Sequence, residues 1–280
     1  MDTIYRVMDA LLPFEFLHYS FMKNALLAML LLTPLLSLLG TMAVNQRMAF
    51  FSDALGHSAL AGVGIGMLLG VKDVTLSLVV FGVLYALLVS VMNRSGAATK
   101  DTTISVSSSM GIALGLLLLS RGGKFSSYSG LLTGDILSIG QNDLLWLLAG
   151  LAAGTAVWAW LYNRLLVSAV SPELAESRGI RSHRLEYAFA VLVAVAVMLA
   201  IRWVGVLLIN ALLILPAAAA RNVARSAAQH ALLSVIFGLV SGVAGLAISF
   251  VMNTGVGAAV VLCAGVIYFV TLLVRRLTAA

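Results

Sequence analysis

Residues 47–70 read RMAFFSDALGHSALAGVGIGMLLG, an apolar run that contains an aspartate, Asp53, and a histidine, His57. The run is long enough to cross a bilayer as a helix. Two residues four positions apart lie on one face of such a helix, separated by about 6 Å along its axis. Because a carboxylate and an imidazole can share a metal ion or a proton, this stretch predicts a membrane helix with a polar site.

The composition of the whole chain is that of a membrane protein. Of its 280 residues, 61% are hydrophobic and 10% are charged, and the mean hydropathy is +1.07. Soluble domains have a much larger charged fraction. We therefore expect an all-α polytopic membrane protein that forms a single transmembrane domain over residues 1–280. The net charge of +6 comes without a basic tract, so no nucleic-acid partner is expected.

Nine apolar segments can be traced along the chain. The sixth and seventh are short, and only Arg202 and Trp203 separate them, so together they can also form one broken helix. We therefore expect eight to nine transmembrane helices. The segments are 22–44, 49–70, 74–92, 103–120, 143–166, 187–201, 203–219, 231–252 and 256–274.

Lys and Arg are unevenly divided between the two sides of this arrangement. Cytoplasmic loops are enriched in these residues, so the richer side is expected to be cytoplasmic, with the N-terminus outside and the C-terminus inside. The poorer side holds Arg6, Lys23, Lys72, Arg121, Lys124 and Arg202. The richer side holds the other eleven of the 17: Arg47, Arg94, Lys100, Arg164, Arg178, Arg181, Arg184, Arg221, Arg225, Arg275 and Arg276.

In this orientation the Asp–His pair lies deep in the membrane. With Arg47 at the cytoplasmic edge, His57 falls roughly 15 Å into a hydrocarbon layer about 30 Å thick. An ionised carboxylate is costly there unless it is paired or hydrated, which makes Asp53 a functional candidate. Three roles are open: metal handling, proton relay, and a hydrogen-bonded pair that only fixes helix packing. For a metal site, a second copy, water or other side chains must supply the remaining ligands.

A stripe of small residues runs along the same helix, one position away from the face of Asp53 and His57. Small residues at a spacing of four let another helix approach closely. The stripe therefore predicts that the pair lies beside a tight helix contact. Its members are Ala54, Ser58, Gly62, Gly66 and Gly70.

Two further polar residues are candidates for the same pathway. Asp135 lies in the external loop 121–142, and it faces a vestibule if the apolar centre of that loop dips back into the protein; otherwise it is a solvated carboxylate. Asn210 lies in an apolar segment and can either hydrogen-bond between helices or line the pathway. Pro216, in the same segment, is expected to kink or end its helix.

The cytoplasmic loop 167–186 carries the start and stop signals of a short helix. Ser171 suits the N-cap, Pro172 suits the first helical position, and Gly179 suits a C-terminal stop. They predict a helix at about 172–178. So short a helix is unstable alone, and we expect it to dock on the protein's own helix ends or on a soluble partner.

Four stretches are similar, in sequence and in order, to the manganese/zinc/iron class of ABC transporter permeases. FSDALGHSALAGVGIG resembles the family's serine/aspartate-aspartate-Ala-Leu-x-His-x-Ala signature. The others are LLTGDIL at 131–137, SPELAESRGI at 171–180 and GVLLINALLILPAAAAR at 205–221. The resemblance spans nearly the whole chain and implies a transport subunit, not an enzyme.

The resemblance also implies a cargo and partners. It implies a homodimeric permease of an ATP-binding-cassette importer in the bacterial cytoplasmic (inner) membrane, supplied by an extracytoplasmic metal-binding protein. The cargo would be manganese, zinc or ferrous iron, with no permanently bound cofactor. A separate ATPase subunit would hydrolyse ATP, which agrees with the absence of a Walker A pattern in this sequence.

Site residues follow from the matching motifs. Asp53 and His57 match the family's intramembrane metal ligands, and we take Asp135 and Asn210 as candidate pathway residues. The segment expected to couple to the ATPase contains Pro172, Glu173, Leu174, Ala175, Glu176, Gly179 and Ile180. The alternative is a proton-coupled secondary metal transporter, which would use the Asp–His pair but would need neither a docking helix nor an ATPase.

Overall fold

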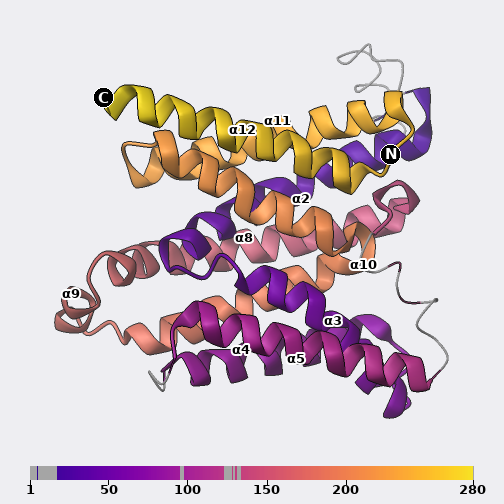
Figure 1. Cartoon of the computed structure of the whole chain (residues 1–280), viewed down its shortest axis with the longest axis horizontal. Coiled ribbons are helices and arrows are strands. Elements are labelled where there is room, and N and C mark those ends of the chain that lie inside the picture. The colour runs from indigo at the N-terminus through magenta and orange to yellow at the C-terminus, as the bar shows by residue number, and fades with distance from the viewer. Residues whose placement is uncertain are drawn as a thin grey trace. The chain divides into compact units, whose positions relative to one another are not determined.

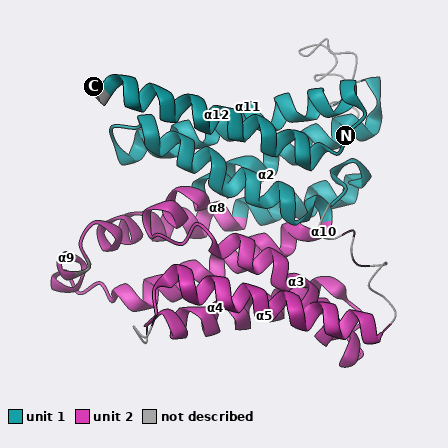
Figure 2. Ribbon diagram, in the orientation of Figure 1, with its two compact units in different colours: residues 1–38, 133–152, 203–280 teal, residues 39–132, 153–202 magenta. Residues whose placement is uncertain are grey.

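The computed structural model describes residues 5, 18–94, 98–122, 128, 130 and 134–279. Over these residues the regular structure is entirely helical, which confirms the all-α class. The chain divides into two compact units (Figure 2). Unit 1 comprises residues 1–38, 133–152 and 203–280, and unit 2 comprises residues 39–132 and 153–202.

Eight long helices make up most of the described part of the chain (Figure 1). Among the described residues, seven helices are long and apolar enough to cross a membrane, and α3, which carries the polar Asp53 and His57, is not one of them. The long helices are α2 (Ser20–Asn45), α3 (Phe51–Leu68), α4 (Val74–Arg94), α5 (Lys100–Arg121), α8 (Gln141–Val170), α10 (Ser182–Val223), α11 (Ala227–Met252) and α12 (Val256–Ala279). Two short elements, η2 (Ile136–Ser138) and α9 (Pro172–Ser177), lie between them.

The sixth and seventh predicted segments form one broken element, α10. It contains 42 residues and is interrupted at Gly205, where φ is 78° and ψ is 163°. A positive φ of this kind favours glycine, which has no Cβ to clash. An unbroken helix of that length would extend about 63 Å, roughly twice the hydrocarbon thickness, so each half is about long enough for one crossing. The count of eight to nine crossings stays a prediction.

Pro216 does not end its helix, contrary to one of the two expected outcomes. The helix continues to Val223. Proline removes the hydrogen bond that the carbonyl four residues earlier would accept, here that of Leu212. Ser37 of α2 donates its Oγ–H to the Leu212 carbonyl oxygen at 3.3 Å, so a neighbouring helix satisfies the freed acceptor.

Small residues lie at the contact between α2 and α11 in unit 1. Ser234 donates its Oγ–H to the carbonyl oxygen of Ser37 at 3.0 Å. A Cβ on Gly238 would lie 2.5 Å from Ser37 Oγ and 2.6 Å from a Thr33 methyl carbon, so a larger residue here would force these side chains to move. Serine and glycine thus let these helices approach closely, as small residues do between membrane helices.

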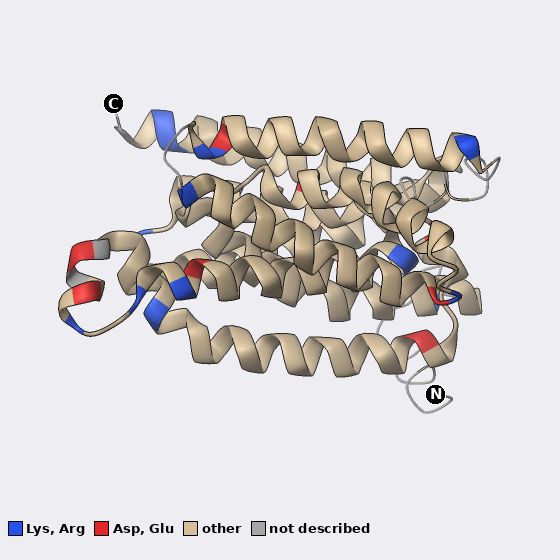
Figure 3. Cartoon of the chain, turned by 90° about the horizontal axis from the view of Figure 1, so that it is seen from below, with Lys and Arg blue, Asp and Glu red and all other residues tan. Residues whose placement is uncertain are grey.

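Charged residues lie mainly near the ends of the helices and leave the helix middles largely apolar (Figure 3). In unit 2, Lys100 at the start of α5 forms an ion pair with Glu186 at the start of α10, with Nζ and Oε1 3.2 Å apart. Arg202, near the break in α10, donates to Thr75 Oγ1 at the start of α4, at 2.9 Å. This distribution suits helices whose middles lie in hydrocarbon.

Candidate functional site

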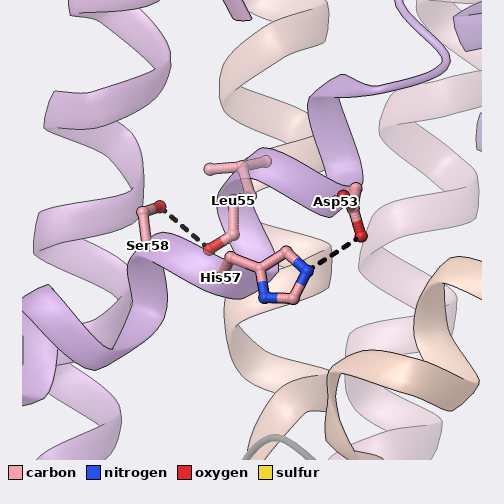
Figure 4. Close-up of polar contacts among 4 residues, drawn as sticks. All are labelled: Asp53, Leu55, His57 and Ser58. Carbon is pink, nitrogen blue, oxygen red and sulfur yellow. Dashed lines mark hydrogen bonds and ion pairs between the residues drawn. The ribbon is translucent and has the colours of Figure 1, made fainter. Parts of the chain in front are cut away.

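The predicted Asp–His pair lies in the first two turns of α3. Asp53 is in the first turn, where the positive end of the helix dipole favours a carboxylate. His57 follows one turn later on the same face, and its Nε2 lies 3.4 Å from Asp53 Oδ1 (Figure 4). The His57 and Asp53 side chains remain 40% and 48% exposed. Both groups are therefore close enough to act together and open to a ligand.

α5 packs against α3 at backbone distance. A Cβ on Gly111 would lie 2.5 Å from Ser58 Cβ, and a Cβ on Gly115 would lie 2.7 Å from the backbone nitrogen of Ala61. Further along, a Cβ on Gly64 of α3 would lie 2.8 Å from Leu118 Cβ. Contact positions rise together along both helices, so α3 and α5 run parallel.

α4 packs against another side of α3 in the opposite direction. A Cβ on Gly62 would lie 3.0 Å from the Phe81 side chain, and Ser77 donates its Oγ–H to the Gly62 carbonyl oxygen at 2.6 Å. Gly66 also faces Ser77, so contact positions rise along α3 as they fall along α4. The predicted close contact beside the pair is confirmed. Gly70 takes no part in it, because it lies beyond the end of α3 with φ at +70° and no neighbour within 4 Å of its Cβ position.

Asp53 and His57 supply at most two side-chain ligands. Among the described residues, no group of three or more His, Cys, Asp and Glu side chains is placed to hold a metal ion. Divalent transition metals bind four to six ligands. A cation at this pair must therefore complete its coordination with water, hydroxyl or carbonyl oxygens, or a second copy of the chain.

Asp135 caps a turn in unit 1. Its Oδ1 accepts a hydrogen bond from the backbone N–H of Leu137 at 3.1 Å, and its carbonyl oxygen accepts one from Ser138 Oγ at 2.8 Å. These bonds hold η2, as an aspartate at an N-cap commonly does. The carboxylate is exposed, and its role in a pathway stays a prediction. Residues 131–133 of the LLTGDIL motif lie outside the described part of the chain.

The segment around Asp135 is held against the break in α10 from both sides of that residue. Gly134 lies so close to the Val204–Gly205 peptide that a Cβ would be 2.1 Å from the Val204 carbonyl oxygen. Asp143 accepts hydrogen bonds from Trp203 Nε1 at 2.9 Å and from the Gly140 backbone N–H at 3.1 Å. Sequence reasoning missed Asp143, although an acid at the start of an apolar segment was a visible signal.

Asn210 lies half-buried in the second half of α10. It belongs to unit 1 together with Asp135, whereas Asp53 and His57 belong to unit 2. The structural and the pathway roles of Asn210 both stay predictions.

The predicted short helix is present as α9, within one residue of its expected end. Its C-terminus is a Schellman motif: Gly179 N–H donates to the Glu176 carbonyl oxygen and Ile180 N–H donates to the Ala175 carbonyl oxygen, each at 2.9 Å. Gly179 has φ at +73°, the left-handed conformation that this motif requires. Ser171 accepts the first helical hydrogen bond on its carbonyl oxygen, from Ala175 N–H at 3.1 Å.

α9 has two exposed acidic side chains and one buried small side chain. Ala175 is fully buried, while Glu173 and Glu176 are exposed. The side chains of Pro172 and Leu174 lie outside the described part of the structure. The helix thus buries one small side chain and offers two exposed carboxylates to another molecule.

Comparison with known proteins places this architecture among transport proteins. The sequence profile of the ABC 3 transport family matches residues 18–275. The chain is 30% identical over 256 residues to the high-affinity zinc uptake system membrane protein ZnuB of Haemophilus influenzae, covering 90% of this chain and 97% of that protein. It is 29% identical over 257 residues to the manganese transport system membrane protein MntC of Listeria monocytogenes, covering 92% and 91%. The solved structure of PsaBC from Streptococcus pneumoniae in complex with Fab matches with a TM-score of 0.78 and 28% identity, covering 97% of this chain and 95% of that one.

Proposed function

The chain belongs to the ABC 3 transport family, and we propose that it is the membrane permease subunit of an ATP-binding-cassette importer for a divalent transition metal. Relatives named for manganese and for zinc transport support this proposal. The observation that carries it is the Asp53–His57 pair: a half-exposed carboxylate and imidazole on one face of a helix otherwise lined with small and apolar residues.

The cargo we propose is manganese, zinc or ferrous iron. A carboxylate oxygen and an imidazole nitrogen are ligands that all three accept. In a homodimer, a second Asp53–His57 pair could complete the coordination shell of one ion. The close packing of α3 against α4 and α5 keeps the pair in place as the metal arrives and leaves.

The transport path and its partners follow from the same assignment. An extracytoplasmic metal-binding protein delivers the metal, and Asp135 and Asn210 are candidate groups along the path. A separate ATPase subunit supplies the energy from the cytoplasmic side of a bacterial inner membrane. The N-terminus then lies outside and the C-terminus inside, which supports placing α9 against the ATPase through Glu173 and Glu176.

The proton-coupled alternative makes a different prediction about the energy source. In vesicles whose lumen is the cytoplasmic side, the complete complex is expected to accumulate radioactive metal in the lumen when ATP is enclosed with the ATPase. An imposed proton gradient without ATP is expected to drive no accumulation. Accumulation driven by the gradient alone would overturn the importer and favour a secondary transporter.

Replacing Gly179 with proline is expected to uncouple ATP hydrolysis from transport. Proline fixes φ near −65° and lacks the N–H that bonds to Glu176, so it cannot adopt the observed φ of +73°. The Schellman end of α9 would be lost at a cost of about 1–3 kcal/mol. We expect metal-stimulated ATPase activity to fall severalfold while metal binding to the permease is retained.

Gly70→Pro is the matched control for that experiment. Gly70 has φ at +70°, and like Gly179 it has no neighbour within 4 Å of its Cβ position. It lies in the turn between α3 and α4, which is external in the proposed orientation. ATPase stimulation that survives Gly179→Pro, or that falls equally in both variants, would contradict the docking role of α9. Reversing the charges of Glu173 and Glu176 tests the same surface without changing the backbone.

A further inference from the structure

We propose that Ser108 of α5 is a specificity-determining residue of the metal path, with its hydroxyl oxygen facing the cation held by Asp53 and His57. The proposal rests on the function proposed above and extends the site to a second helix. It follows from the register of α3 and α5, both of which belong to unit 2.

The parallel packing fixes which α5 side chains share a flank with His57. We take the Ser58–Gly111 contact as the reference. His57, one residue before Ser58 on α3, is rotated from it by about 100° around the helix axis. Ser108, three residues before Gly111 on α5, is rotated by about 300° around the axis of α5, which equals about 60° in the opposite sense. The contact faces of two parallel helices point toward each other, while both helices turn in the same sense. Rotations of opposite sense away from the contact therefore bring side chains to the same side of it. Ser108 and His57 therefore lie on the same side of the α3–α5 contact.

The same register sets the level of Ser108 along the helices. Relative to the Ser58–Gly111 contact, His57 lies about 1.5 Å back, Ser108 about 4.5 Å back and Asp53 about 7.5 Å back, at 1.5 Å per residue. Ser108 is thus level with the space between the carboxylate and the imidazole. Ser105 lies one turn further along the same flank.

Exposure agrees with this placement. Ser107, Gly111 and Gly115 are buried against α3, whereas Ser108 is half-buried and Ser105 is exposed. Asp53 and His57 are also partly exposed. Two hydroxyls, a carboxylate and an imidazole therefore lie on one accessible side of the α3–α5 contact.

The chemistry of a hydroxyl gives Ser108 its role. A serine oxygen can coordinate a cation directly or accept a hydrogen bond from a water molecule in the cation's shell. Oxygen ligands favour manganese, whereas imidazole nitrogen favours zinc. An added oxygen beside the Asp–His pair should therefore improve manganese handling more than zinc handling.

The uptake experiment compares Ser108→Ala with Ser109→Ala in cells that express the intact transporter. Ser109 is two steps back from Gly111, so it points away from α3, and its hydroxyl donates to the Ser105 carbonyl oxygen at 3.1 Å. In Ser108→Ala, the apparent KM for manganese relative to that for zinc is expected to rise about tenfold, the size of effect seen on removing a group that supports metal ligands. Ser109→Ala is expected to leave the ratio unchanged. An unchanged ratio in Ser108→Ala, or equal loss for both metals, would overturn the proposal.

A labelling experiment tests proximity without relying on transport. In a Cys263→Ala background, Ser108→Cys gives one thiol on the proposed flank, and Met110→Cys gives one on the opposite flank. Excess Mn²⁺ is expected to slow modification of the Ser108→Cys variant by a small thiosulfonate and to leave modification of the Met110→Cys variant unaffected. Adding His57→Ala should abolish the protection. Equal protection of both variants, no protection of Ser108→Cys, or protection that survives His57→Ala would each overturn the proposal.

The two proposals fail in different ways. Normal metal uptake in His57→Ala would remove the function proposed for the pair, and with it the role of Ser108. Loss of uptake in His57→Ala together with an unchanged metal ratio in Ser108→Ala would remove the serine assignment alone.

Discussion

Replacing His57 with alanine is expected to reduce metal uptake to the background of cells that lack the transporter. His57 contributes one of the two protein ligands at the proposed site, 3.4 Å from the other. Removing groups that merely support a metal ligand costs roughly 10- to 100-fold in affinity or activity, and a direct ligand should cost more. The measurement is initial uptake of radioactive manganese and zinc at matched amounts of protein in the membrane.

Ser58→Ala provides the control for this result. Ser58 follows His57 directly on α3, and its hydroxyl donates to the Leu55 carbonyl oxygen at 3.0 Å in the same helix (Figure 4). We expect near-normal uptake from this variant. Uptake by His57→Ala at the level of Ser58→Ala would show that the Asp–His pair only fixes helix packing.

Replacing Gly115 with alanine is expected to destabilise the protein by about 1–3 kcal/mol, as overpacking of a close contact does. The added Cβ would lie 2.7 Å from Ala61 N and 2.8 Å from the Leu60 carbonyl carbon. Both are backbone atoms of α3, so α3 itself must move and carry Asp53 and His57 with it. Thermal unfolding of the purified protein in detergent measures the loss.

Gly150→Ala separates this packing effect from the general effect of adding a methyl group to a helix. Gly150 lies within α8 and has no atom within 4 Å of its Cβ position. Alanine is favoured over glycine in helices by up to about 1 kcal/mol, so this variant should be unchanged or slightly stabilised. Equal stability of the two variants would contradict the close α3–α5 contact.

Several features of the fold could be predicted because they depend on local sequence. The membrane class follows from composition, and the face shared by Asp53 and His57 follows from their spacing of four. The ends of α9 follow from Ser171 and Gly179, whose cap preferences act over one turn. The possibility of one broken element at Arg202 and Trp203 was also visible, although the break itself lies at Gly205, where the backbone adopts φ of 78°.

Other features depended on contacts that no local pattern contains. Pro216 was expected to kink or end its helix; the helix continues, and Ser37, distant in sequence, donates a hydrogen bond to the freed Leu212 carbonyl. The stripe on α3 predicted a close neighbour but could not say that α5 and α4 would both pack there, in opposite directions. Asp143 was overlooked because its partner, Trp203, lies 60 residues away.

The sequence by itself determined that this chain is a multi-pass membrane protein, that one helix carries a paired carboxylate and imidazole, and that a short capped helix precedes α10. Helical periodicity and cap chemistry act between residues close in the chain, so the amino-acid order contains them. Only the tertiary structure decided that α5 runs parallel to α3 at backbone contact. That register depends on how Gly111 and Gly115 fit against Ser58 and Ala61, and it brings Ser108 to the flank of His57.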